Sequence, residues 1–430
     1  MAKTFRPYAP TQRLLLPPSI EDWVPEGHLA RFIDEVVEDL DLSKILDAYD
    51  EKRGYPPYDP RMMAKVLLYA YATGTYSSRR IAAQLVDSVA FRYLGAGNRP
   101  DFRTVGKFRR RHGVALQDFF AQVVRLCGKA GLVKLGRVAV DGTKIKANAS
   151  KHKAMSYGRM KEKETQLERE IGEWLRRSDE TDREEDRRYG KDKQGDELPA
   201  ELATRAARLK KIREAKAALE AEAREKGKKK GKDPDDTDPP DRAQRNFTDP
   251  ESKIQKTPDG FIQGYNAQIA VDAESHVIVA QHVTSAAPDV EELIPAVSAI
   301  GRMLRKRPRQ VLADAGYYSE ANVDVLQERG IEAFIATRRQ KHDEKRLPGP
   351  KGRIPTTFTA KQRMERKLRT VRGRAIYATR KVIPEPVFGL IKQARGFRQF
   401  LRRGLQNVSE EWALVCTAHN LLKLHRVWAG

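Results

Sequence analysis

The chain has 430 residues, 40% of them hydrophobic and 33% charged, which predicts a globular protein of two or three domains with a sizeable core. The formal net charge of +23 predicts salt-sensitive binding to a polyanion, with a basic solubilising surface or membrane-surface attraction as the alternatives. The sequence has no long apolar run or secretory signal, which excludes a membrane-spanning protein and favours a cytoplasmic one. The only cysteines, Cys127 and Cys416, lie in apolar stretches typical of a reduced core, which excludes a zinc site.

Residues 1–130 are predicted to form an all-α domain. Apolar residues recur at helical spacing over 29–40. A second helix is predicted to begin at Asp59 and Pro60, because aspartate is a favoured capping residue and proline is tolerated at the first helical position. A third begins at Ser77. Short helices separated by tight turns suit a helix-turn-helix-like reader of DNA.

The most basic of these helices is predicted over 101–112. Its apolar residues are expected to face inward: Phe102, Val105 and Phe108. Its basic residues are expected to face outward: Lys107, Arg109, Arg110 and Arg111. We predict that these basic residues bind DNA, mainly because of the net charge of the chain. The alternative is a helical packing domain with solvated arginines.

Two short apolar strands are each followed by an aspartate. Asp141 follows the strand 138–140, and Asp314 follows the strand 310–313. Carboxylates are the ligands preferred by Mg²⁺ and Mn²⁺, and paired ions can hold both the attacking and the leaving oxygen of a phosphodiester. The sequence therefore predicts a divalent-metal site that acts on nucleic acid. The alternative is a pair of surface aspartates, which are common at strand ends in α/β proteins.

Residues 156–245 break this pattern. Charged helices are predicted over 161–177 and 200–225, followed by a lysine run from 226 to 232 and then an Asp/Pro run. We interpret the segment as a charged helical insertion with little core of its own. The lysine run is more typical of a solvated linker than of a DNA-binding element.

After the insertion, strands and helices alternate in an order that predicts a mixed sheet flanked by helices. The predicted strands cover 261–272 and 276–284, which form a hairpin, and then 310–313 and 332–336. The predicted helices cover 289–304, 320–329, 360–370 and 411–428.

One further helix is predicted to begin at Pro384 and Pro386, since proline is compatible only with the start of a helix, and to end at Gly404. Its predicted buried stripe contains Val387, Leu390, Ile391, Ala394, Phe397 and Leu401. Lys392 and Arg395 lie on another face. We predict that these two residues bind DNA phosphates together with Lys144 and Lys146, with ordinary surface lysines as the alternative.

Glu385, at the head of that helix, is predicted to be the third carboxylate of the site. Its backbone is restrained by the flanking prolines, and Lys392 projects from nearly the same side two turns later. The other candidates are Glu365, which has local ion partners, and Glu410 and Glu411, which follow Ser409. Acidic residues at a helix amino terminus favour the helix dipole, which explains Glu410 and Glu411 and is also the alternative for Glu385.

Strand with aspartate, hairpin, helix, strand with aspartate and helix with glutamate is the element order of a ribonuclease H-like fold. The sequence also resembles the DDE transposases of bacterial insertion sequences over nearly its whole length. The matching stretches are Val138-Ala-Val-Asp-Gly-Thr-Lys-Ile-Lys-Ala-Asn148, Gly264-Tyr-Asn-Ala-Gln268, Ala313-Asp-Ala-Gly-Tyr317 and Glu385-Pro-Val-Phe-Gly-Leu-Ile-Lys392. Tyr377, Arg380, Glu385 and Lys392 also follow the family's glutamate signature, with one extra residue between Arg380 and Glu385.

The resemblance implies that Asp141, Asp314 and Glu385 hold two Mg²⁺ ions, with Mn²⁺ as the alternative. It implies hydrolysis at the transposon ends, followed by attack of the freed 3′-OH on target DNA, with the terminal inverted repeats and the target as partners and a homodimer on DNA. The catalytic domain would then cover 131–155 and 246–430. The alternatives are a ribonuclease H-like nuclease that only hydrolyses and an inactive DNA-binding protein.

Overall fold

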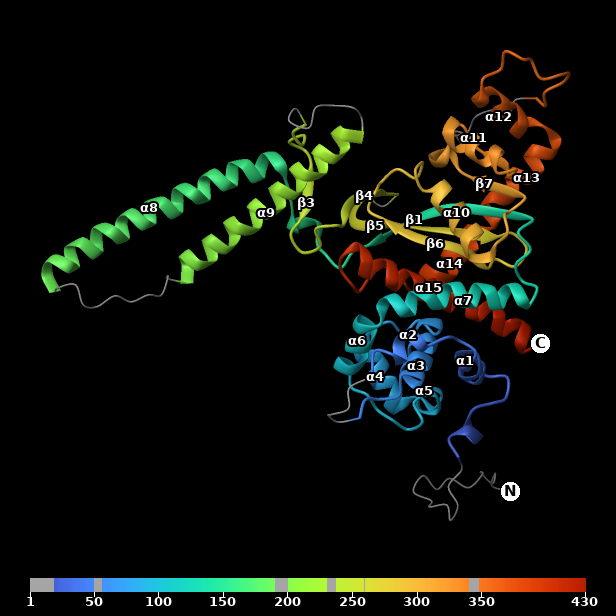
Figure 1. The fold of residues 1–430 in the computed structure, drawn as a ribbon, viewed down its shortest axis with the longest axis horizontal. Helices are drawn as coiled ribbons and strands as arrows, with labels where there is room; N and C mark the ends of the chain where they lie inside the picture. The colour runs from blue at the N-terminus through green and yellow to red at the C-terminus, as the bar shows by residue number, and fades with distance from the viewer. Residues whose placement is uncertain (1–18, 50–55, 190–199, 230–236, 259, 340–347) are drawn as a thin grey trace, which may run out of the picture.

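The computed structural model describes residues 19–49, 56–189, 200–229, 237–258, 260–339 and 348–430 (Figure 1). Of the predicted lysine run, residues 226–229 continue the preceding helix, contrary to the expected linker, and residues 230–232 lie outside the described residues. No helix in the described ranges is both long enough and apolar enough to cross a membrane. Cys127 and Cys416 are buried free thiols, as predicted.

The all-α region begins with a short 3-10 helix, Glu21–Trp23. It continues with α1 (Leu29–Glu38), α2 (Ser43–Leu46), α3 (Pro60–Ala72), α4 (Ser78–Asp87), α5 (Val89–Leu94), α6 (Phe102–Arg111) and α7 (Gly113–Lys129). The sequence predicts α1, α3, α4 and α6, and it did not locate α5 and α7. The caps explain two of the starts. Asp59 accepts a hydrogen bond from the Arg61 amide at 2.6 Å, and Asp101 accepts one from the Thr104 amide at 2.6 Å.

A six-stranded mixed sheet forms the second part of the molecule. Its strands are β1 (Arg137–Lys146), β4 (Lys253–Thr257), β5 (Gly260–Asp272), β6 (Ile278–Thr284), β7 (Gln310–Ala313) and β8 (Glu332–Ile335). The order is β4-β5-β1-β7-β8, and β6 pairs with β5 on the edge opposite β1, beyond the residues that pair with β4. β1 is antiparallel to β5 and parallel to β7. This arrangement confirms the predicted mixed α/β sheet and its hairpin.

The expectation that the first strand ends at Asp141 is wrong. β1 continues to Lys146 because β5 remains paired with it from Val138↔Asp272 as far as Lys146↔Gly264. The parallel neighbour β7, by contrast, is paired with β1 only as far as Ala139↔Leu312. Asp141 therefore lies within a long strand, at the level where its parallel neighbour stops.

Helices pack against the sheet that contains this strand. They are α10 (Leu293–Leu304), α11 (Glu320–Glu328), α12 (Ala360–Arg369), α13 (Val371–Val382), α14 (Pro384–Gly389) and α15 (Leu405–Trp428). The sequence did not predict α13, which Thr370 caps by accepting a hydrogen bond from the Gly373 amide. The predicted helix to Gly404 is also wrong, because α14 passes into a π-turn, Leu390–Ala394, and Gly396 then takes the left-handed conformation with φ +71°.

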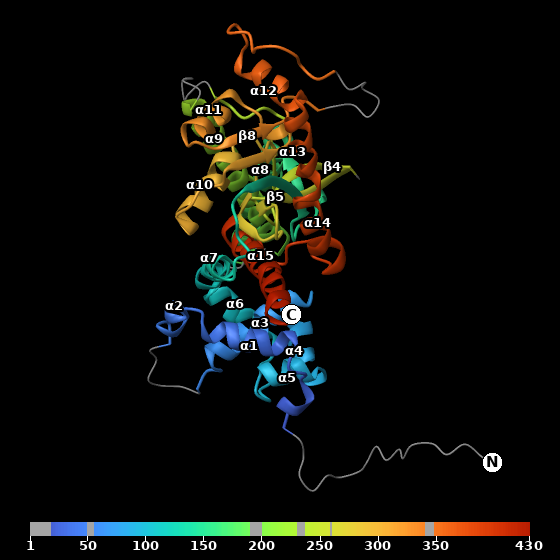
Figure 2. The ribbon, with the colours of Figure 1, turned by 90° about the vertical axis from the view of Figure 1, so that its right-hand side faces the viewer.

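The C-terminal helix α15 lies between the sheet and the N-terminal helices (Figures 1 and 2). It packs against β6 on one side and against α3 and α7 on the other. Trp412 in α15 is fully buried and donates a hydrogen bond from Nε1 to the Gln268 carbonyl at 3.2 Å. The buried apolar residues of both parts form one continuous cluster. The N-terminal helices and the sheet therefore share a single core, although the chain passes from one to the other near residue 130.

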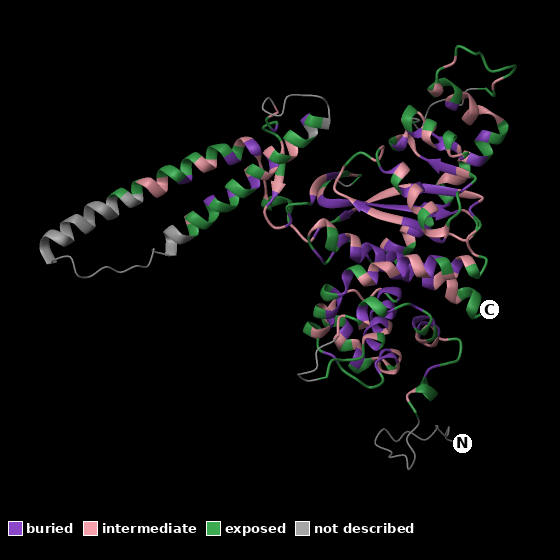
Figure 3. Cartoon of the chain, in the orientation of Figure 1, coloured by how far each residue is buried: buried purple, intermediate pink, exposed green. Residues whose placement is uncertain are grey.

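The insertion projects from the body as an antiparallel pair of long helices, α8 (Tyr157–Tyr189) and α9 (Ala200–Lys229) (Figure 1). A separate two-stranded sheet joins it to the body, formed by β2 (Ala154–Ser156) and β3 (Gln244–Asn246). A small core holds the pair together: Tyr157, Met160, Leu167, Leu209, Ile212, Ala215 and Leu219. Most of its other described residues are exposed or only partly buried, whereas buried residues gather in the sheet, α7 and α15 (Figure 3).

Candidate active site

Asp141 and Asp314 lie on neighbouring parallel strands at the same level of the sheet. The register pairs Ala139 with Leu312, and each aspartate is two residues beyond its member of that pair. Asp314 immediately follows β7, and its Oδ1 accepts a hydrogen bond from the Gly316 amide at 2.8 Å. The parallel pairing therefore brings together two carboxylates that are 173 positions apart in the sequence.

Burial raises the pKa of Asp141 to about 6. The Arg380 guanidinium opposes this shift, with Nη1 3.6 Å from Asp141 Oδ2, while the negative charges of Asp314 and Asp289 add to it. The Asp141 side chain is 19% exposed, so solvent and a ligand can still reach it. A partly buried carboxylate next to a second one is stabilised by a bound cation. This pair therefore fits a divalent ion.

Arg380 comes from α13, one turn beyond Tyr377. Both belong to the glutamate signature of the sequence, and the structure brings both to the aspartate pair. Burial raises the pKa of the Tyr377 hydroxyl, and the negative charges of Asp314 and Asp141 act on it in the same direction. The neighbouring Lys381 is exposed. Arg380, and not Lys381, is therefore the basic residue of that signature that contacts the site.

Glu385 is exposed in the first turn of α14, which packs against β1 and β5. Its carboxylate has no hydrogen bond or ion pair within the described ranges. No group of three His, Cys, Asp or Glu side chains able to hold a metal ion occurs there either. The described side chains thus bring together two of the three predicted ligands, and Glu385 stands apart from them.

The other glutamates weighed against Glu385 are occupied elsewhere. Glu365 accepts a hydrogen bond from Thr337 Oγ1 at 2.8 Å. Glu410 is buried in an ion pair with Arg402, and Glu411 accepts the Leu401 and Arg402 amides at 3.0 and 3.1 Å. These last two do not lie at a helix start, because α15 begins at residue 405.

Three lysines predicted to bind phosphate lie along β1. Lys392 in the π-turn donates from Nζ to Thr143 Oγ1 and, at 3.3 Å, to the Lys144 carbonyl, and burial lowers the pKa of Lys392. Lys144 Nζ lies 3.1 Å from the Ala287 carbonyl and 3.4 Å from Asp289 Oδ1. Lys146 is exposed. Positive charge therefore follows the strand away from Asp141.

Two arginines predicted to face outward are turned inward. Arg109 is 8% exposed and donates to the Tyr71 hydroxyl and the Tyr76 carbonyl, both at 3.0 Å. Arg395 Nη2 lies 3.1 Å from His419 Nδ1, and burial lowers the pKa of Arg395. The Arg109 guanidinium is therefore enclosed by partners distant in sequence, whereas Arg395 is half-buried between His419 and the Leu390 carbonyl, 3.4 Å from its Nε.

The other three residues of α6 that were predicted to face outward, Lys107, Arg110 and Arg111, are exposed. Phe102, which was expected to be buried, is 38% exposed. The Arg79 and Arg103 guanidiniums lie over its ring, 5.2 and 5.6 Å from the centroid.

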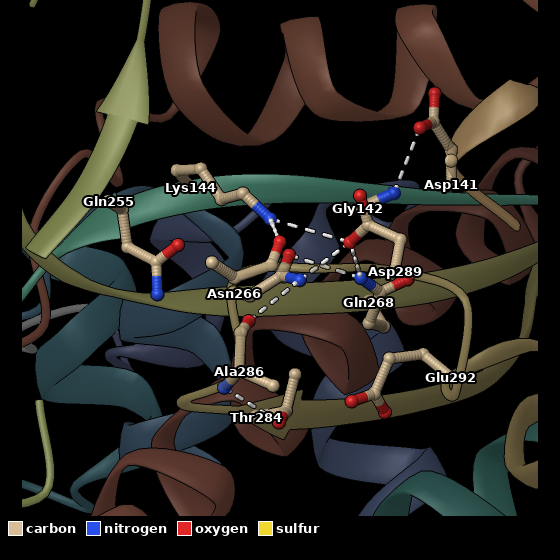
Figure 4. A network of polar contacts seen from close by, with 12 residues as sticks. Asp141, Gly142, Lys144, Gln255, Asn266, Gln268, Thr284, Ala286, Asp289 and Glu292 are labelled. Atoms are coloured by element: carbon tan, nitrogen blue, oxygen red, sulfur yellow. Dashed lines mark hydrogen bonds and ion pairs between the residues drawn. The ribbon is translucent and has the colours of Figure 1, made fainter. Parts of the chain in front are cut away.

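A polar network beside the aspartates was not predicted from the sequence. Asn266 and Gln268 on β5 and Asp289 in the loop before α10 meet next to Gly142 (Figure 4). A Cβ on residue 142 would lie 2.3 Å from Gln268 Nε2, so only glycine leaves room for this amide. The stretch Gly264–Gln268 was noticed as a family match, whereas Asp289 was recognised only as the start of a helix.

Neighbouring strand carboxylates with lysines beside them, on a strongly basic chain, are the arrangement of enzymes that transfer nucleic-acid phosphates with the help of divalent ions. Residues 207–421, half of the chain, match the family model Transposase DDE domain, and residues 18–111 match the Transposase domain (DUF772). The chain belongs to the DDE transposase family.

A putative transposase for insertion sequence element IS402 from Burkholderia cepacia is similar to this chain, with 40% identity over 85 residues. The similarity covers 18% of this chain and 40% of that protein, so it spans less than half the length of the relative. No solved structure matches the chain.

Proposed function

We propose that this protein is a DNA transposase that cuts phosphodiester bonds at the ends of its element and joins the freed 3′-OH to target DNA. The observation that carries the proposal is the pairing of Asp141 with Asp314 on adjacent strands of a DDE-family chain. We also propose a ribonuclease H-like fold for the sheet, because β1, the β5–β6 hairpin, α10, β7 and the Glu385 helix follow one another in that order. The protein would act in the cytoplasm, as a homodimer on two element ends.

The proposed metal ligands are Asp141 and Asp314, with Glu385 as the third. Two Mg²⁺ ions, or Mn²⁺ in their place, would activate the attacking oxygen and stabilise the leaving one. Lys392 and Lys144 are fixed along β1, and together with the exposed Lys146 they would offset phosphate charge. The Arg380 guanidinium, 3.6 Å from Asp141, balances that carboxylate in the free protein.

The decisive experiment is a strand-transfer assay with purified protein, Mg²⁺, DNA carrying the ends that flank the coding sequence, and a supercoiled target. We expect 3′-OH ends to appear first and joined products to follow. Products that stop at cleavage would identify a nuclease that only hydrolyses. An absence of both cleavage and joining, with end binding intact, would identify an inactive DNA-binding protein.

We further propose that the exposed basic residues of α6 bind the element ends. Replacing Lys107 and Arg110 with glutamate should weaken end binding by about a hundredfold at moderate salt and reduce its salt dependence, because each residue releases counterions from a phosphate. Gel-shift titration at several salt concentrations measures both effects. The full chain is needed, since the N-terminal helices share their core with α15.

The matched control changes the same charge on the insertion, where Lys210 and Lys211 are exposed on α9. Glutamate at both positions should leave end binding within a few-fold of the wild type. Equal losses from the α6 and α9 variants would show a general charge effect and would refute the assignment to α6.

A further inference from the structure

Phe102 is an exposed aromatic side chain in the first turn of α6. Its ring is 38% exposed, although the helical pattern of the sequence predicts that it faces inward. The Arg79 guanidinium of α4 lies over the ring, 5.2 Å from its centroid, and the Arg103 guanidinium lies over it at 5.6 Å. Because a guanidinium is attracted to the face of an aromatic ring, the two arginines fix this apolar ring at the surface of the protein.

The buried Arg109 fixes α4 relative to α6. Its guanidinium donates to the Tyr76 carbonyl at 3.0 Å and to Ser78 Oγ at 3.3 Å, just before and at the start of α4. The two helices pack against each other (Figure 1). The surface that carries Phe102 is therefore already formed in the free protein, and little ordering is needed when it binds a partner.

Basic side chains on the same two helices are left without partners. Arg79 is exposed in the first turn of α4, and Arg103, Lys107 and Arg110 follow one another at positions i, i+4 and i+7 on the exposed face of α6. In the described part of the chain, none of these four side chains has a hydrogen bond or an ion pair. α6 itself contains no acidic residue. The surface around Phe102 therefore complements a polyanion, and its charges are available to one.

We propose that Phe102 recognises the 5-methyl group of a thymine in the element ends, with α6 lying in the major groove. This inference rests on the proposed binding of the ends by α6. The amino-terminal turn of a recognition helix is the part that reaches base edges. A phenylalanine ring has no hydrogen-bonding atom, and the thymine methyl is the apolar group that the major groove displays. Lys107 and Arg110 would bind phosphates, which position the helix without reading sequence.

Replacing thymine with uracil removes this methyl group and keeps the base pair, so it tests the contact directly. In gel-shift titrations, the full-length wild type should bind uracil-substituted ends about fourfold or more weakly than the natural ends, as expected for the loss of one buried methyl group. Phe102→Ala should bind the natural ends more weakly than the wild type and should lose the difference between the two DNAs. Replacing one thymine at a time should then locate the contacted base.

Phe261→Ala is the matched control, because it removes another exposed phenylalanine ring, at the start of β5 in the sheet. It should keep the wild-type ratio of affinities for the two DNAs. If Phe102→Ala does not fold, Phe102→Leu keeps an apolar side chain without the ring and should still lower that ratio. Arg79→Gln should lower it to an intermediate extent, since the ring remains and one of the groups that fix it is lost.

Replacing Lys107 and Arg110 with glutamate separates this inference from the proposed end binding. If that change weakens binding while Phe102→Ala still distinguishes thymine from uracil, α6 binds the ends without this base contact and the inference is wrong. If neither change affects binding, α6 is not the DNA-binding surface and both proposals fall. A wild type that binds both DNAs equally would refute the methyl contact, even where Phe102→Ala weakens binding to both.

Discussion

Asp141→Asn and Asp314→Asn should each lower Mg²⁺-dependent cleavage of element ends by about a thousandfold or more while leaving end binding nearly unchanged. The two carboxylates sit side by side only through the β1–β7 register, and no described side chain duplicates either position. The substitutions keep the shape of the side chain and remove its charge. Cleavage and gel-shift binding measured on the same preparations test the expectation.

For Asp141→Asn, thermal unfolding in the absence of metal provides a folding control, because the pKa of the Asp141 carboxyl is raised in the folded protein. Because this pKa is raised from 3.8 to about 6, the folded state binds more protons than the unfolded state between those pH values. Ionisation of Asp141 therefore lowers the free energy of unfolding as the pH rises through that window, by at most about 3 kcal/mol. Without divalent ions at pH 8, Asp141→Asn should melt at the wild-type temperature or above it.

Two outcomes would contradict this account. Wild-type cleavage by either variant would remove that residue from the site. A metal-free Asp141→Asn protein that melts well below the wild type at pH 8 would show that the carboxylate is a structural partner of Arg380, and the loss of cleavage would then report misfolding.

Glu385→Gln should also abolish cleavage, with fold and end binding retained. The physical reason is that Glu385 is exposed at the start of α14, which packs against the strand of Asp141 and is followed by the π-turn that seats Lys392 on the same strand. We expect DNA binding to bring this carboxylate to the aspartate pair. Cleavage of pre-nicked and intact ends, with gel-shift binding, measures the effect.

Glu365→Gln is the matched control for Glu385→Gln, because its carboxylate is hydrogen bonded to Thr337 and lies on α12. It should retain cleavage within a few-fold. Normal cleavage by Glu385→Gln, combined with loss in Glu365→Gln, would place the third ligand on α12 instead.

The sequence predicts those features that depend on local pattern. Short apolar runs ending in aspartate identified the strands before Asp141 and Asp314, and caps such as Asp59 with Pro60 identified helix starts. The extension of β1 beyond Asp141 was not predictable, because it depends on pairing with β5, more than a hundred residues later. The local sequence pattern of a strand does not show which strand pairs with it when a long insertion separates the two.

The errors at Arg109 and Arg395 have a similar origin. A helical period places an arginine on the polar face, but Tyr71, Tyr76 and His419 supply buried hydrogen-bond partners that only the tertiary fold brings near. Asp289 was missed for the same reason, since it lies in a loop and its hydrogen-bond donors, Asn266 and Gln268, lie on β5. A helical or strand period shows which side of an element is polar; it does not show which polar side chains are enclosed.

The position of α15 has a consequence for biosynthesis. α3 and α7 leave the ribosome early, yet the surfaces that they bury against α15 stay uncovered until residues 405–428 have been translated. The nascent N-terminal helices therefore carry exposed apolar faces throughout synthesis of the sheet and the insertion. A premature stop codon before α15 would release a chain with those faces uncovered. Such a chain would aggregate or be captured by chaperones and proteases, and a free DNA-binding fragment would not accumulate.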